Sequence, residues 1–251
     1  MKIRILLLFC GFAMTLSTLP AQKTVREEQQ LWLAVSSQTR LSEKWGIWAD
    51  FHYRMRDHFI ENPTLLVGRM GATYYLNEAV RLTAGYAYFH HLPADGHKNI
   101  AQPEHRPWQQ IQWFTRWPKL QLAQWLRLEE RFRHKILDDD HLAEGYHFNW
   151  RMRYNFTASV PLGKKRFEPG GLLLVLGQEL MANFGKTIVY NHFDQSRLSA
   201  SFAYQISEQA QFSVGYTYIY LQLSSGDAFS KQHLIRVSYA HNFDWRKESK
   251  N

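Results

Sequence analysis

Arginine recurs at alternate positions along several segments of the chain. Arg151 and Arg153 are separated by one residue, and Arg127, Glu129 and Arg131 follow the same spacing. Alternate side chains of a β-strand point to one face, so each group would share a surface. The planar fork of arginine bonds carboxylates and phosphates through two parallel hydrogen bonds. These residues are therefore suited to binding small anions or to building a network of ion pairs.

Followed strand by strand, this polar face collects twelve arginines, three carboxylates and one histidine. Its members are Asp50, His52, Arg54, Arg56, Arg69, Arg81, Arg116, Arg127, Glu129, Arg131, Arg133, Arg151, Arg153, Glu179, Arg197 and Arg236. One interpretation is a filled interior in which the glutamates anchor several arginines, as in other small barrels. The other is a passage or pocket with a positive potential that selects anions. The predicted binding residues are Arg54, Arg56, Arg69, Arg127, Glu129, Arg131, Arg151, Arg153, Glu179, Arg197 and Arg236.

Two side chains of this polar face, together with a serine on the neighbouring strand, raise the question of catalysis. His52 could serve as a base, with Asp50 to orient it or Ser36 on the neighbouring strand as a nucleophile. The chain contains no nucleophile elbow and no HExxH motif. We therefore predict no catalytic residues, and a lipid-modifying outer-membrane enzyme stays as an alternative.

Two polar segments carry side chains that bind metals in other proteins. Four histidines lie in or beside residues 93–107, namely His90, His91, His97 and His105. Residues 138–140 are consecutive aspartates, which could take Ca²⁺ or bridge lipopolysaccharide through a divalent ion. Neither segment has regular ligand spacing, so the sequence predicts no metal site and no cofactor.

The elements that position these residues are long alternating strands. Residues 148–160 are apolar at even positions and polar at odd ones, which indicates a strand with one apolar face. Similar alternation predicts strands at 30–40, 45–56, 64–76, 80–91, 108–117, 120–133, 146–161, 171–182, 195–206, 210–222 and 232–243. Short turns alternate with longer loops between them, which is typical of a transmembrane β-barrel.

Eleven segments are recognised, whereas bacterial single-chain barrels normally have an even number of strands. We therefore predict an all-β fold, a single antiparallel up-and-down transmembrane β-barrel of about 12 strands, with 10 as the fallback. Aromatic residues near strand ends would form the interface girdles, among them Trp45, Tyr75, Trp108 and Trp117. A soluble sandwich or lipocalin-like barrel is disfavoured by the strand lengths.

Composition narrows the class of protein. The 251 residues carry a net charge of +8, are 15% aromatic, and include 8 prolines and 14 glycines, which argues against a disordered or collagen-like chain. No apolar run approaches the ~20 residues of a membrane helix. Nucleic acid is not an expected partner, because the positive charge would point into the barrel.

The first residues match a secretory signal peptide, with basic, apolar and small-residue regions in order and a cut after Ala21. Cleavage would remove Cys10, the single cysteine, so no disulfide is expected. The predicted organisation is residues 1–21 as signal peptide, 22–29 as a short N-terminal segment, 30–245 as the barrel and 246–251 as a polar tail.

Several segments resemble the DUF2490 family, predicted outer-membrane β-barrel proteins common in Gram-negative bacteria of the Bacteroidota type. They are LRLEERF (126–132), GQELMANFG (177–185), FDQSRLSASFAYQIS (193–207) and FSVGYTYIY (212–220). The resemblance covers residues 30 to 245 and implies an outer-membrane location, but it supplies no functional residues.

For function, we expect a narrow channel or binding barrel for small anionic solutes, in contact with outer-membrane lipid and lipopolysaccharide. The alternatives are a structural or partner-binding barrel with a plugged lumen and, below it, the lipid-modifying enzyme.

Overall fold

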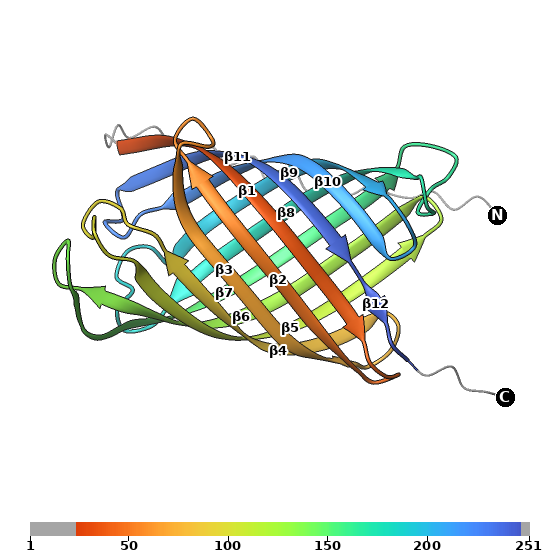
Figure 1. Cartoon of the computed structure of the whole chain (residues 1–251), viewed down its shortest axis with the longest axis horizontal. Coiled ribbons are helices and arrows are strands. Elements are labelled where there is room, and N and C mark those ends of the chain that lie inside the picture. The colour runs from red at the N-terminus through yellow and green to blue at the C-terminus, as the bar shows by residue number, and fades with distance from the viewer. Residues whose placement is uncertain (1–23, 247–251) are drawn as a thin grey trace, which may run out of the picture.

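A computed structural model describes residues 24–246 as one closed β-barrel (Figure 1). Its strands are β1 (Thr24–Arg40), β2 (Trp45–Arg56), β3 (Asn62–Tyr75), β4 (Val80–His91), β5 (Gln102–Trp117), β6 (Leu120–Ile136), β7 (Leu142–Pro161), β8 (Leu172–Phe184), β9 (Phe193–Gln205), β10 (Ala210–Gln222), β11 (Ala228–His241) and β12 (Phe243–Asp244). The prediction of an all-β barrel of about 12 strands is confirmed: eleven long strands form the wall, and β12 adds two residues. The predicted signal peptide lies outside the described residues.

No helix in the described part of the chain is long and apolar enough to cross a membrane. Each strand from β1 to β10 pairs with the next one along the chain, and these pairs are antiparallel. The alternation of side chains along each strand, which favours two-faced sheets, extends over 12 to 20 residues in these strands.

The barrel closes through a parallel seam. β1 lies parallel to β11 from Thr24↔Ala228 to Ser36↔Ala240, and β12 continues the contact at Thr39↔Phe243. An odd number of antiparallel strands brings the first and last strands together in the same direction, so the seam departs from the fully antiparallel pattern that we expected. The eleven segments recognised in the sequence are thus the whole wall, and no strand was missed.

The two faces of the wall differ as predicted from strand parity. Apolar side chains point outward, and several are more than half exposed, including Met70 at 65%, Leu198 at 59% and Phe202 at 58%. Polar side chains point inward, where Glu104 is 0% and Glu129 is 2% exposed. The barrel is therefore apolar outside and charged inside.

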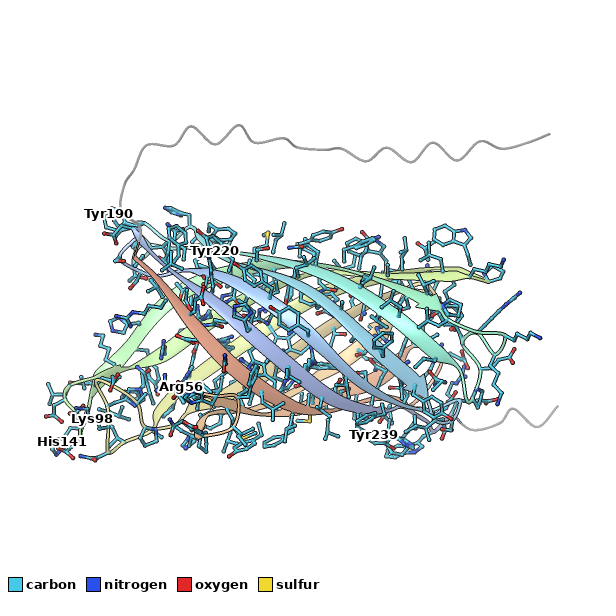
Figure 2. The ribbon with its side chains drawn as sticks, turned by 90° about the horizontal axis from the view of Figure 1, so that it is seen from above. Arg56, Lys98, His141, Tyr190, Tyr220 and Tyr239 are labelled. Carbon is cyan, nitrogen blue, oxygen red and sulfur yellow. The ribbon has the colours of Figure 1, made fainter. Side chains whose placement is uncertain are left out.

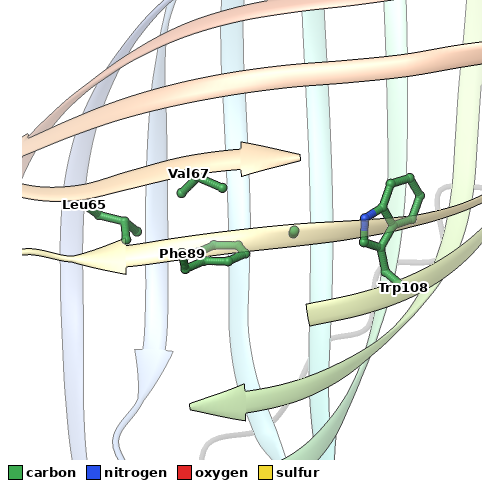
Figure 3. Packing of buried hydrophobic residues seen from close by; sticks show 5 residues of the cluster. Leu65, Val67, Phe89 and Trp108 are labelled. Atoms are coloured by element: carbon green, nitrogen blue, oxygen red, sulfur yellow. The ribbon is translucent and has the colours of Figure 1, made fainter. Parts of the chain in front are cut away.

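A compact apolar cluster packs on the inner wall of β3, β4 and β5 (Figure 3). It contains Leu65, Val67, Ala87, Phe89 and Trp108. The indole of Trp108 lies across two glycines: a Cβ on Gly71 would stand 3.1 Å from the ring, and one on Gly85 would stand 2.6 Å from it. The absence of side chains at these two positions makes room for the indole.

Two of the four aromatic residues predicted for the interface girdles lie elsewhere. Trp45 and Trp117 are exposed on the outside, but Trp108 and Tyr75 are buried inside, at 1% and 8% exposure. Trp108 has the parity of Arg106 and Glu104 on β5, which the prediction placed in a loop before the strand. The direction of its side chain could therefore not be read from the preceding residues.

Candidate functional site

The lumen contains a cavity of about 900 Å³ whose wall is rich in arginine. Its arginines come from seven strands and are Arg54, Arg69, Arg106, Arg127, Arg131, Arg133, Arg151, Arg153, Arg197 and Arg236. Loop residues Ile188, Asn191 and Ser224 also line it, so the cavity lies toward the long-loop end of the barrel. We refer to it as the arginine cavity.

Glu104 on β5 anchors one group of these arginines. Its Oε1 accepts hydrogen bonds from Nε of Arg106 at 2.7 Å and from Nε of Arg131 at 2.8 Å. Nε2 of His91 lies 3.1 Å from Oε2 of the same carboxylate. Because Glu104 is fully buried, this carboxylate offsets charge that would otherwise be costly inside the barrel.

A second group forms a layer on the inner wall of the neighbouring strands β5 to β8. Nη1 of Arg153 donates to Oε1 of Glu129 at 2.6 Å, and its Nε donates to Oε1 of Glu179 at 2.9 Å. Nη1 of Arg127 lies 3.9 Å from Glu129, and its guanidinium carbon lies 4.2 Å from the ring centre of Trp108. Carboxylates and aromatic rings together hold these arginines in fixed positions.

Asp50 on β2 holds both His52 and Arg69. Nε of Arg69 donates to Oδ1 of Asp50 at 2.8 Å, and Nε2 of His52 lies 2.9 Å from Oδ2. Nδ1 of His52 is buried with no hydrogen-bond partner among the described residues. Ser36 lines the same cavity, but no hydrogen bond joins it to His52 within residues 24–246. The geometry thus forms the Asp50–His52 pair without a nucleophile bonded to it.

Asp194 at the start of β9 is a fifth interior carboxylate. Its Oδ2 lies 3.1 Å from Nε of Arg151, and its Oδ1 accepts a hydrogen bond from Nδ2 of Asn183 at 3.0 Å. The arginine cavity therefore sets ten arginines against five carboxylates, which are Asp50, Glu104, Glu129, Glu179 and Asp194. The positive charge is only half balanced by the protein.

A smaller cavity of about 460 Å³ lies at the short-turn end. Arg81 and Arg116 line this cavity rather than the larger one. Ser36 and Trp48 line both cavities and thus lie between them. Trp48 packs edge-on against Trp108, with ring centres 5.4 Å apart. Trp48 therefore marks the level at which the two cavities adjoin.

Nine of the eleven predicted binding residues line the arginine cavity. Glu129 is buried among them and bonded to Arg153. Arg56 stands apart, because it lies at the end of β2 and its Nε is 3.4 Å from Asp57, the next residue. Whether these residues bind a solute stays a prediction; their positions inside the barrel are now defined.

The sequence analysis missed Glu104 and Arg106, because Pro103 and Pro107 suggested a loop. β5 nevertheless begins at Gln102, and both prolines have the outward parity. The β5–β6 register lacks pairs at Arg106 and Pro107, as expected where a proline removes an N–H donor. Alternation of polar and other residues from 102 to 106 was the signal that could have revealed this part of the strand.

The four histidines near residues 93–107 do not converge. His91 contacts Glu104 inside the barrel, whereas Nδ1 of His97 lies 2.8 Å from the carbonyl oxygen of Ile100. His90 and His105 lie beside Tyr88 in clusters of aromatic rings. Within residues 24–246, no group of three or more acidic, histidine or cysteine side chains could hold a metal ion.

The acidic run at 138–140 joins two long loops. Asp139 accepts the amide of Asn99 through its carbonyl oxygen at 3.0 Å, and Asp140 accepts Nδ2 of Asn99 at 2.6 Å. Figure 2 shows Lys98 and His141 close together at this end of the barrel. The amide of Asp140 also donates to Asp138 at 2.9 Å, which holds the pKa of that carboxyl below its ordinary value.

Comparison with known proteins agrees with the resemblance seen in the sequence. No curated protein and no solved structure matches the chain significantly. The model of the DUF2490 family, described as a protein of unknown function, matches residues 29–230. This match spans β1 to the first residues of β11 and so includes most of the wall. The chain therefore belongs to the DUF2490 family.

Proposed function

We propose that this chain is an outer-membrane β-barrel that admits small anionic solutes into its arginine cavity. The observation that carries the proposal is the imbalance of ten arginines against five carboxylates in a cavity of about 900 Å³. A surplus of fixed positive charge in a low-dielectric enclosure attracts anions and raises their local concentration. A soluble protein would have no need to arrange this charge inward and its apolar side chains outward.

The membrane part of the proposal is supported by the outer surface. The long strands present apolar side chains outward, as a surface in contact with lipid requires. Because the closed barrel has no free edge, the backbone N–H and C=O groups of its strands are paired within the wall. Four of the five connections at one end have two to four residues, whereas those at the other end have five to ten; the ten-residue connection 162–171 is the exception at the first end (Figure 1). In outer-membrane barrels the longer loops are extracellular, so the arginine cavity would open outward, toward lipopolysaccharide and external solutes.

The proposal is tested by planar-bilayer recordings of the refolded protein under a KCl gradient. We expect the sign of the reversal potential to show anion selectivity. Arg133→Gln should reduce that selectivity, because Arg133 lines the cavity and is bonded to Gln102 rather than to a carboxylate. Lys164→Gln is the matched control, since it removes the same charge from an exposed turn.

Cation-selective current, or equal selectivity in Arg133→Gln and the wild type, would contradict the proposal. The division of the lumen into two cavities at Trp48 favours a second candidate, a plugged barrel with a structural or partner-binding role. Insertion into the bilayer without current would favour this candidate. Failure to insert into lipid would contradict both.

A further inference from the structure

Three arginines of the arginine cavity have no carboxylate within 4.0 Å among residues 24–246. The other seven are paired with Asp50, Glu104, Glu129, Glu179 or Asp194. Of the three, Arg133 donates its Nε to Oε1 of Gln102 at 2.7 Å. Arg54 and Arg236 make no side-chain hydrogen bond to the described residues. These two guanidinium groups therefore have neither a carboxylate nor a hydrogen-bond partner in the described chain.

The seam of the barrel brings Arg54 and Arg236 together. Trp32 on β1 is opposite Arg54 in the antiparallel register with β2, and opposite Arg236 in the parallel register with β11. The three residues thus form a row across neighbouring strands on the inner wall. The unexpected parallel closure creates this row, because it fixes which residue of β11 stands beside Trp32.

Trp32 is a rigid platform for the arginines. It is 5% exposed, and its indole Nε1 donates to Oε1 of Gln30 at 2.8 Å. The guanidinium carbon of Arg54 lies 3.6 Å from the ring centre of Trp32, and that of Arg197 lies 5.1 Å from it. Stacking on an aromatic face holds a guanidinium group while leaving its N–H edge free for an anion.

The charges at this row are unfavourable without a counter-ion. Arg54 is repelled by Arg197, Arg69, Arg106 and Arg236. Its Nε is shielded from solvent and lacks a hydrogen-bond partner in the described chain, which is costly for a charged group. Arg236 is exposed and lines the cavity, so its donors are accessible from the lumen. Both arginines are thus available to one ligand.

We propose that Arg54, Arg236 and Arg197 bind the phosphate group of a small solute beside Trp32. A carboxylate would balance the charge of only one of Arg54 and Arg236, whereas a phosphate carries about −1.5 to −2 near pH 7 and balances both. Its peripheral oxygens can accept from several arginine forks at once. Arg197 reaches Glu179 with Nη1 at 3.5 Å and donates Nε to Oε1 of Gln195 at 2.8 Å, which leaves Nη2 for the ligand. This inference rests on the proposed function and names the solute class for it.

The test is calorimetric titration of the refolded protein in a phosphate-free maltoside detergent at fixed pH and ionic strength. Inorganic phosphate should bind, and acetate should bind at least tenfold more weakly. Arg236→Gln and Arg54→Gln should each weaken phosphate binding about tenfold or more, since each removes a charged hydrogen-bond donor. Within residues 24–246 the side chain of Arg236 makes no hydrogen bond or ion pair, so Arg236→Gln tests the site even if Arg54→Gln is unstable. Lys164→Gln should bind as the wild type does.

Two probes, one a soluble molecule and one a lipid, identify the source of the phosphate group. Binding of glycerol 3-phosphate with the same sensitivity to Arg236→Gln supports a free solute as the ligand. If short-chain phosphatidic acid, a phosphate monoester like glycerol 3-phosphate, binds in its place, the free solute is overturned as the ligand in favour of a lipid headgroup.

Other outcomes separate this inference from the proposed function. Equal affinity for acetate and phosphate, or loss of binding in Arg133→Gln but not in Arg236→Gln, overturns the phosphate site. A flat titration beside anion-selective bilayer current overturns it as well and leaves the proposed function standing. A flat titration together with silent insertion overturns both.

Discussion

Replacing Glu129 by glutamine should destabilise the barrel strongly without changing its shape. The side chain is 2% exposed and its Oε1 accepts from Nη1 of Arg153 at 2.6 Å. Its Oε2 lies 3.4 Å from Nη1 of Arg106. Glutamine has nearly the same volume, so the change removes one negative charge from the layer and little packing. The layer then contains more unbalanced positive charge in a buried place.

The expected loss of stability follows from the carboxylate partners that each arginine keeps in Glu129→Gln. Arg153 keeps Glu179 and Arg106 keeps Glu104, but Arg127 loses its one carboxylate within 4.0 Å in the described chain. Breaking a buried ion pair costs about 3–5 kcal/mol. Because two of the three arginines stay paired, we expect about 3 kcal/mol, the lower end of that range.

The assay is urea unfolding of the lipid-inserted protein, followed by tryptophan fluorescence. The matched control is Glu130→Gln, since Glu130 is the next residue and has the outward parity; it should change stability by less than about 0.5 kcal/mol. Adding Arg127→Gln to Glu129→Gln should cost less than the sum of the single changes. A loss below about 1 kcal/mol in Glu129→Gln, or an equal loss in Glu130→Gln, would refute the reasoning.

Three further outcomes are expected. Gly85→Ala should cost about 1–3 kcal/mol in the same unfolding assay, because its Cβ would stand 2.6 Å from the indole of Trp108, whereas Gly68→Ala has no neighbour within 4 Å and should be near neutral; equal effects would contradict the packing. Leu198→Arg should cost about 2–4 kcal/mol in lipid if the outer face meets hydrocarbon, and a change within about 0.5 kcal/mol would argue for a solvated surface. The carboxyl of Asp138, followed by ¹³C NMR, should titrate below its ordinary pKa. The stability that the ionised carboxylate gives the loop is fully present above about pH 4 and is lost as the pH falls through the lowered pKa. An ordinary pKa would contradict the hydrogen bond from Asp140.

Alternation alone located the wall of the barrel and the inward direction of its arginines. The reason is local: a strand with period two carries its orientation in its own residues, so Arg151 and Arg153 could be placed without knowing their neighbours. The predicted strand at 45–56 has the same bounds as β2. The predicted resemblance to the DUF2490 family is confirmed by the match of the family model to residues 29–230.

Closure and pairing were beyond the sequence because they are not local. The residues of β1 and β11 do not themselves indicate that the two strands lie parallel. Because bacterial barrels normally have an even number of strands, a twelfth long strand was expected. The partners of the arginines depend on register across strands, which the sequence leaves open. Glu104 and Asp194 were missed for a different reason: both lie in strand ends that had been assigned to loops.

The odd strand number has a consequence for the handling of this protein. β1 starts at the long-loop end and β11 finishes at the short-turn end, so Thr24 and His241 are separated by the length of the barrel (Figure 1). At about 3.3 Å per residue, the 14 residues of β11 alone extend over roughly 46 Å. A short linker therefore cannot join the two ends in a circular permutant, unlike in a barrel with an even number of strands. If the barrel spans a bilayer, epitope tags placed before β1 and after β12 would be exposed on opposite sides of it. One antibody applied to intact cells would then detect the first tag and not the second.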